Sequence, residues 1–229
     1  MKRSKFFFLM IPIFLLFGLN CLDAGQQPLY TTENQFLNEI IPSRSPSQKI
    51  TSPQSYIECE PIDITSDFQL NNSGFKGNGT IDDPILIEGY NITYSSGSLI
   101  YISGTTYYFR IANNLLNGMT TAEYGIDLHN VQNGVIVNNT IRDFFRYGIR
   151  FGDPAGCNNN VIANNTICNN GLHGIWTGDS HYNIIEGNTI YNNGGMGIIL
   201  GDSEFNIIRS NIVYDCMWGL EICSNSNYN

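Results

Sequence analysis

Five side chains that could bind a sugar polymer recur along the chain at nearly equal intervals. Each is the third residue of a short segment that alternates apolar and variable residues: LIYI (99–102), GIDL (125–128), GIRF (148–151), GIWT (174–177), GIIL (197–200) and GLEI (219–222). Aromatic rings can stack on sugar rings, carboxylates accept hydrogen bonds from hydroxyl groups, and a guanidinium binds a carboxylate through paired hydrogen bonds. The ligand-binding candidates are Tyr101, Asp127, Arg150, Trp176 and Glu221, with Ile199 at the equivalent position of the fifth segment.

These candidates lie 22–26 residues apart, so they can act together only in a fold that stacks one repeat on the next. A second kind of segment recurs between them: RIANNLL (110–116), VIVNNTI (135–141), VIANNTI (161–167), IIEGNTI (184–190) and IIRSNIV (207–213). Its second residue is always isoleucine and its fifth is always asparagine. The earlier segment LIEGYNI (86–92) keeps the isoleucine but has Tyr90 in the asparagine position.

A period of 23–26 residues with several short strands per repeat predicts a β-solenoid. Each coil would pair in parallel with the next, about 4.8 Å along the axis, with isoleucines inside and Gly and Asn at the corners. The asparagines predicted to hydrogen-bond from coil to coil as a structural ladder are Asn114, Asn139, Asn165, Asn188 and Asn211. A leucine-rich repeat is the alternative, but it requires a leucine frame and a helical half that the pattern does not offer.

The pattern GIxL followed by N-x-I-x-x-N-T-I-x-x-N resembles the repeat of right-handed parallel β-helix proteins, namely the pectin-lyase-like proteins and their NosD-type relatives. The segment GNGTIDDPILIEGYNI (77–92) resembles the stretch that opens the first coil in many extracellular β-helix proteins of archaea and bacteria. The resemblance covers residues 56–229 and implies an all-β fold, a single-stranded right-handed parallel β-helix of about 6–7 coils. The last coil is incomplete, so we expect an end that is open, or capped by further sequence or another chain.

The resemblance places a carbohydrate groove where the candidates lie, but it does not assign a reaction. A glycosidase needs two carboxylates about 5–9.5 Å apart, and Asp127 and Glu221 would be four coils apart. A lyase needs a base and a cation for the uronate; Arg150 could be that cation, but no Ca²⁺-binding acidic cluster is evident. The alternative is a solvated face on which Asp127 and Arg150 simply pair. The catalytic residues therefore stay unassigned, and so does the question whether the protein is an enzyme.

Metal binding has weak candidates only. Asp153, Asp179 and Asp202 recur in GDP, GDS and GDS, and stacked carboxylates could hold Ca²⁺. The competing interpretation is that each aspartate caps its own turn. NosD-type relatives are associated with copper-enzyme maturation, but His129, His173 and His181 do not recur as a ligand cluster. Ca²⁺ is thus the one cofactor that the sequence leaves open.

Composition restricts the partners further. The formal net charge is −9 and only 14% of the residues are charged, with the basic residues scattered singly. Nucleic acid is therefore not expected as a partner, because phosphate binding needs a clustered positive surface. Beyond Cys21, five cysteines lack CxxC spacing, so one disulfide could form but its pairing cannot be assigned.

The N-terminus predicts export. MKRSK followed by the apolar run at 6–19 has the form of a signal peptide, with cleavage expected near residue 24. An uncleaved membrane anchor and a lipid-modified Cys21 are the alternatives. Residues 25–55 resemble a polar linker and residues 56–229 form the predicted repeat domain. Asparagine sequons at Asn71, Asn78, Asn91, Asn138 and Asn164 agree with a secreted or cell-surface location.

The sequence therefore favours an exported β-helix module that binds carbohydrate or contributes to a cell-surface scaffold without catalysis. The alternative is a polysaccharide lyase or glycoside hydrolase that acts on an acidic or neutral polysaccharide through the face carrying Asp127, Arg150 and Trp176. The expected partner is a polysaccharide or surface glycan. A membrane contact is expected only through an uncleaved N-terminal segment.

Overall fold

The structure is a computed structural model that describes residues 55–223 and 225–229, without the side chains of residues 153–155. The expected signal peptide (1–24) and nearly all of the expected linker (25–55) lie outside the described residues. Within them the chain forms twenty β-strands and one short helix, which confirms the all-β fold. The one described helix is far too short to cross a membrane.

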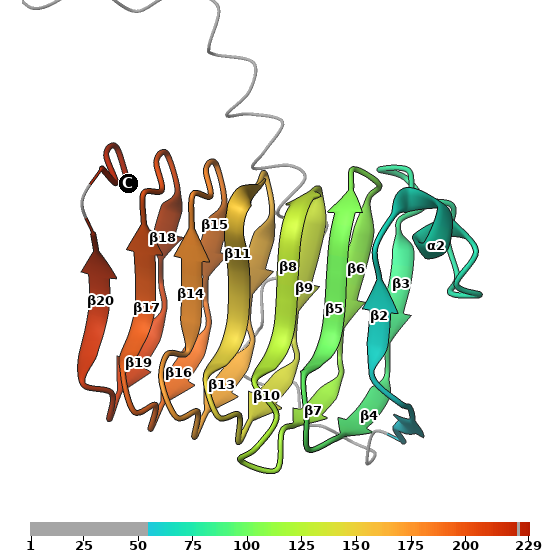
Figure 1. The fold of residues 1–229 in the computed structure, drawn as a ribbon. Coiled ribbons are helices and arrows are strands. Elements are labelled where there is room, and N and C mark those ends of the chain that lie inside the picture. Colours follow the sequence, from blue (N-terminus) through green and yellow to red (C-terminus); the bar gives the residue numbers. More distant parts are fainter. Residues whose placement is uncertain (1–54, 224) are drawn as a thin grey trace, which may run out of the picture. The chain divides into compact units, whose positions relative to one another are not determined.

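The strands wind into a solenoid, because strands three apart in sequence lie side by side (Figure 1). Every pairing between named strands is parallel, as the period predicted. One sheet, called sheet A, consists of β1 (Ile57–Glu58), β4 (Tyr90–Thr93), β7 (Leu115–Asn117), β10 (Thr140–Arg142), β13 (Thr166–Cys168), β16 (Thr189–Tyr191) and β19 (Ile212–Tyr214).

Two further sheets complete each coil. Sheet B consists of β2 (Ile62–Ile64), β5 (Ser98–Thr105), β8 (Tyr124–Gln132), β11 (Tyr147–Asn158), β14 (Ile175–Gly178), β17 (Met196–Gly201) and β20 (Trp218–Ile222). Sheet C consists of β3 (Ile85–Glu88), β6 (Phe109–Ala112), β9 (Gly134–Val137), β12 (Val161–Ala163), β15 (Ile184–Glu186) and β18 (Ile207–Arg209).

The recurring isoleucines form the centre of the core. In sheet C they pair in register from coil to coil, and all but the last are completely buried. Each buried isoleucine contributes about 1.5–3 kcal/mol. The column consists of Ile87, Ile111, Ile136, Ile162, Ile185 and the half-buried Ile208.

The corners between strands follow one local rule, in which a residue with positive φ precedes a residue whose side chain turns inward. At the corner from sheet C to sheet A, φ lies between 54° and 64° at Asn113, Asn138, Asn164, Gly187 and Ser210. Asparagine and glycine tolerate this left-handed conformation better than other residues do. The predicted use of Asn and Gly as corner residues is therefore confirmed.

The inward residue after each of these corners hydrogen-bonds to the next coil. Asn139 shows the arrangement: its backbone N–H and its Nδ2 both donate to Asn165 Oδ1, each at 3.0 Å, and Nδ2 also donates to the Ile111 carbonyl at 2.9 Å. The same pattern runs through Asn114, Asn139, Asn165, Asn188 and Asn211. These amides join neighbouring coils and satisfy buried backbone groups.

Sequence reasoning missed three more columns of this kind at the other corners. The longest contains Asn160, Asn183, Asn206 and Asn229. Shorter columns contain Asn170 and Asn193, and Ser180, Ser203 and Ser226. Part of their signal was present, since Asn-Asn recurs at 169–170 and 192–193 and Asp-Ser at 179–180 and 202–203, but the isoleucine-based alignment counted only one asparagine per repeat.

The two ends of the described solenoid differ. Helix α2 (Asp67–Asn71) lies at the N-terminal end, with Leu70 completely buried and Asp67 accepting hydrogen bonds from Thr105 Oγ1 and, at 3.1 Å, from the Thr106 N–H. At the other end, β18, β19 and β20 each pair on one side only among the described strands. Trp218 and Leu220 of β20 are exposed there.

Candidate functional site

The strand register of sheet B places the five ligand-binding candidates in one row along the solenoid. Each is paired with the corresponding residue of the next coil, and neighbouring rungs are about 4.8 Å apart. The row begins one rung earlier than expected, at Asp63. It contains Asp63, Tyr101, Asp127, Arg150, Trp176, Ile199 and Glu221.

Asp63 was missed although IDI (62–64) has the same alternation as the later segments. It precedes Tyr101 by 38 residues rather than by one period, because α2 and the loop after it lengthen this coil. A search by repeat spacing therefore missed Asp63, although the alternation of apolar and polar residues in its strand would have identified it.

Asp127 is at the centre of a polar cluster and its side chain is only 5% exposed. Its carboxylate accepts a hydrogen bond from Ser98 Oγ at 3.1 Å and lies 3.0 Å from His129 Nε2 and 3.6 Å from Arg150 Nη1. Sequence reasoning placed His129 in no site. It is two residues beyond Asp127 in β8, so both side chains leave the same side of the strand.

Arg150 is held between two aromatic rings. Its guanidinium carbon lies 4.8 Å from the centroid of the Tyr124 ring and 5.9 Å from that of Trp176. The side chain remains 24% exposed. One end of the guanidinium faces Asp127, and the side chain keeps further N–H donors for a planar anion such as a carboxylate.

Further aromatic residues extend this surface beyond the predicted set. Tyr147 stacks on Trp176, with 6.0 Å between ring centroids and an interplanar angle of 15°, and on the His173 ring at 5.1 Å. His173 Nδ1 accepts a hydrogen bond from the Met196 N–H at 2.9 Å, and burial lowers the pKa of His173 despite the opposing effect of Glu221. We call the group Ser98, Tyr124, Asp127, His129, Tyr147, Arg150, His173 and Trp176 the sheet B cluster.

A glycine makes room for the histidine of this cluster. Gly152 pairs with His129 in the next coil, and a Cβ added to Gly152 would lie 2.1 Å from His129 Cε1. Any side chain at this position would therefore displace the imidazole from Asp127.

The structure describes the surroundings of two of the three aspartates considered for Ca²⁺, Asp179 and Asp202. The register of β11 shifts between Gly152 and Cys157, and Gly156 lies against the Asp179 carbonyl. The side chain of Asp153 lies outside what is described. Asp202 accepts a hydrogen bond from Asn225 Nδ2 at 2.9 Å, and Asp179 lies 3.6 Å from His181 Nε2. Among the described residues, no three His, Cys, Asp or Glu side chains are grouped as metal ligands.

The cysteines of the described region are all unpaired thiols. Cys157 is completely buried beside β8, and burial raises the pKa of its thiol to about 12. This thiol is therefore protonated and unreactive in the native fold.

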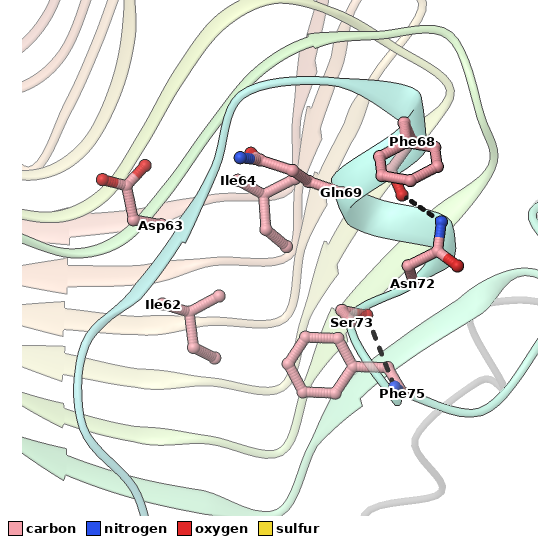
Figure 2. A pocket seen from close by; sticks show the side chains of 8 residues that line it. All are labelled: Ile62, Asp63, Ile64, Phe68, Gln69, Asn72, Ser73 and Phe75. Atoms are coloured by element: carbon pink, nitrogen blue, oxygen red, sulfur yellow. Dashed lines mark hydrogen bonds between the residues drawn. The ribbon is translucent and has the colours of Figure 1, made fainter.

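A separate cavity of about 400 Å³ lies at the N-terminal end of sheet B. Figure 2 shows it between β2 and α2, with Asp63 on the strand side and Phe68 on the helix side. Its polar groups largely satisfy one another: Asn72 Nδ2 donates to the Phe68 carbonyl at 2.7 Å, and Ser73 Oγ donates to the Leu70 carbonyl at 2.7 Å. Asp63 thus belongs both to the rim of this cavity and to the row on sheet B.

The family of the chain follows from comparison with known proteins. The model of the family described as "right handed beta helix region" matches residues 69–181 and 98–229, so the chain belongs to this family. The family assigns the right hand to the solenoid and confirms the fold expected from the repeat. No curated protein matches the chain.

Two solved structures with a similar fold are mutants of the periplasmic alginate epimerase AlgG. A double mutant aligns with a TM-score of 0.51 and 19% identity over 64% of this chain and 35% of that chain. A single mutant aligns with a TM-score of 0.50 and 20% identity over the same shares. The chain thus spans about a third of the length of these neighbours, and at this identity the likeness shows the fold alone.

Proposed function

We propose that this member of the right-handed β-helix family binds a uronate-containing polysaccharide along the outward row of sheet B, outside the cytoplasm. The observation that carries the proposal is Arg150, which lies near the rings of Tyr124 and Trp176, remains 24% exposed and has N–H donors beyond its Asp127 contact for a carboxylate. The similarity in fold to a periplasmic alginate epimerase supports both the ligand class and the location.

The row offers more than a single anion contact. Its rungs are separated by about 4.8 Å, close to the length of one sugar ring, so a polymer lying along the axis would meet one side chain per sugar. Trp176 and Tyr101 provide ring faces on either side of the Asp127–Arg150 pair. Non-catalytic binding, in a surface module or scaffold, needs only these features.

The binding proposal is tested by affinity electrophoresis of the full chain in gels containing neutral or uronate polysaccharides. We expect retardation by uronate polymers and its loss in an Asp127→Ala/Arg150→Ala variant with an unchanged circular dichroism spectrum. Equal retardation of both proteins, or none of either, would contradict the proposal.

A second candidate function, proton abstraction from a uronate, is favoured by the His129–Asp127 pair. The carboxylate lies 3.0 Å from His129 Nε2, which orients the imidazole and leaves Nδ1 to accept a proton. Arg150 would neutralise the uronate carboxylate, so that the adjacent ring carbon loses its proton to His129. Expulsion of the neighbouring glycosidic oxygen, protonated by solvent water, would then give a lyase product, and transfer of a proton from solvent water to the opposite face of the same carbon would give an epimer.

This reaction has its own test. The full chain is incubated with a uronate polymer in D₂O, while ultraviolet absorbance follows unsaturated ends and NMR follows deuterium at the carbon beside the carboxylate. Either signal, abolished by His129→Ala, would establish catalysis. Binding without deuterium incorporation or unsaturated ends would leave the non-catalytic function and reject this second candidate.

A further inference from the structure

The charges along the outward row of sheet B restrict the kind of uronate polymer that fits. Arg150 is the row's single cation. Carboxylates occupy both described ends of the row, at Asp63 and Glu221. Three rungs separate Asp63 from Arg150, and three more separate Arg150 from Glu221.

The other charged groups near the cluster do not add a second cation to the row itself. Asp127 is an anion beside Arg150, at 3.6 Å from Nη1. Arg146 is exposed but precedes β11, so it lies off the row, and it donates a hydrogen bond to the Tyr124 hydroxyl at 3.3 Å. The described row therefore offers a carboxylate one cation.

The row is uncharged on either side of the Asp127–Arg150 pair. Trp176 and Ile199 follow Arg150, and Tyr101 lies beyond Asp127 on the other side. A polymer with a carboxylate on every sugar would place charged groups over these apolar surfaces, where they lose hydration without gaining a partner.

The C-terminal end of the row carries a second carboxylate. Glu221 lies three rungs from Arg150 on the same face. A uronate carboxylate placed there would meet like charge, whereas a neutral sugar would not.

We infer that the polymer is an acidic heteropolysaccharide, in which a uronate bound by Arg150 is separated from the next by neutral sugars that cover Tyr101, Trp176 and Ile199 and extend to Glu221. This inference rests on the proposed binding function and goes beyond it, because a homopolymer of uronates would meet like charges at Asp63 and Glu221. The sheet B face would thus distinguish two classes of acidic glycan by their charge spacing.

The experiment compares three oligosaccharides of equal length by calorimetric titration of the full chain at low salt. One carries a uronate on every sugar, one carries a single uronate flanked by neutral sugars, and one is neutral. We expect the singly charged oligosaccharide to bind at least about fivefold more tightly than the fully charged one. The neutral one should bind more weakly than the singly charged one.

A double variant Asp63→Asn/Glu221→Gln tests the charge effect, since each amide keeps one acceptor oxygen and removes the charge. It should raise affinity for the fully charged oligosaccharide by about fivefold or more and so reduce the preference for the singly charged one. Tighter binding of the fully charged oligosaccharide by wild type, with no response to the double variant, would overturn the inference alone. Absence of binding to both acidic oligosaccharides would overturn the proposed function as well.

Discussion

The corners of the solenoid and the outward row of sheet B obey opposite rules, although both run from coil to coil at one residue per rung. At the corner before sheet A, five successive coils carry the same amide with the same hydrogen bonds. On the outward row, only aspartate appears twice among seven rungs.

This contrast separates architecture from function. Equivalent positions in a solenoid share one backbone geometry, so whatever the fold requires at a position it requires in every coil. A side chain that differs from coil to coil is therefore not needed by the backbone there. The asparagines maintain the stack, whereas the Asp127–Arg150–Trp176 sequence of rungs is left free for ligand chemistry.

The largest effect is expected from breaking the corner column in the middle of the stack. Asn165→Ala removes the Nδ2 hydrogen bond to Asn188 and leaves the Asn139 N–H, one Asn139 Nδ2 hydrogen and the Ile136 carbonyl unpaired, while the backbone N–H of residue 165 still donates to Asn188. The free energy of unfolding should fall by about 3 kcal/mol, since each buried unpaired group costs about 1–3 kcal/mol before relaxation. Urea denaturation measures it, and Asn211→Ala at the last coil, where the stranded groups are only partly buried, should cost less than half as much. Equal costs would contradict the column's role.

Removing an aromatic ring should affect ligand binding and not the stack. Trp176→Ala deletes a ring that contacts Tyr147 and Arg150, and the affinity for a uronate oligosaccharide should fall about tenfold. The matched control is Tyr214→Ala, which removes a ring of the Tyr191–Tyr214 stack on sheet A, with centroids 5.0 Å apart. Calorimetric titration should show unchanged affinity for this control; a similar loss in both variants would indicate a nonspecific aromatic effect.

A smaller effect is expected from adding one methyl group beneath the histidine. Gly152→Ala forces His129 away from Asp127, and we expect a loss of about 1 kcal/mol in stability with a severalfold weaker affinity. Gly201→Ala is the control, because the nearest atom to its added Cβ is the Thr177 carbonyl oxygen at 3.8 Å. Thermal melts and titrations of both variants measure the difference, and indistinguishable variants would mean that the contact at Gly152 does not position His129.

The smallest effect concerns pH. Burial lowers the pKa of His173 in the folded state, where neutral Nδ1 accepts the Met196 N–H. In the unfolded chain the imidazole titrates near its ordinary value of about 6.5. As the pH falls, the unfolded state therefore takes up the proton first. The stabilisation of the folded state by neutral His173 is complete above about pH 6.5 and is lost as the pH falls below that value. Melting temperatures measured across this range should fall less for His173→Gln than for wild type; parallel curves would contradict the assignment.

Much of the fold could be predicted from the sequence because its physical cause repeats. Isoleucine at one position and asparagine three residues later recur at 23–26 residues, and this fixed the parallel stacking and the register of the outward row. The row could be placed because strand alternation decides which side chains leave the same face.

The features that could not be predicted lie where the repeat is interrupted, or where side chains at non-equivalent positions of neighbouring coils contact one another. Asp63 was displaced by the α2 insertion, and the pairing of β11 with β8 shifts register between Gly152 and Cys157. The Tyr124 ring contacts Arg150 from the neighbouring coil. The spacing of residues in the sequence does not show which side chains extend far enough to make such a contact. The cluster was thus only partly accessible to reasoning from the pattern.

The most direct test of the central claim is a titration of the full chain with a uronate-bearing oligosaccharide, comparing Arg150→Gln with Arg209→Gln. Arg209 is a cation on sheet C paired with Glu186 at 2.5 Å, so the control removes the same charge from a different face. The account predicts at least a tenfold loss of affinity for Arg150→Gln and no loss for Arg209→Gln, with both variants folded. Equal affinities for both variants and wild type would contradict the assignment of the sheet B row as the binding surface.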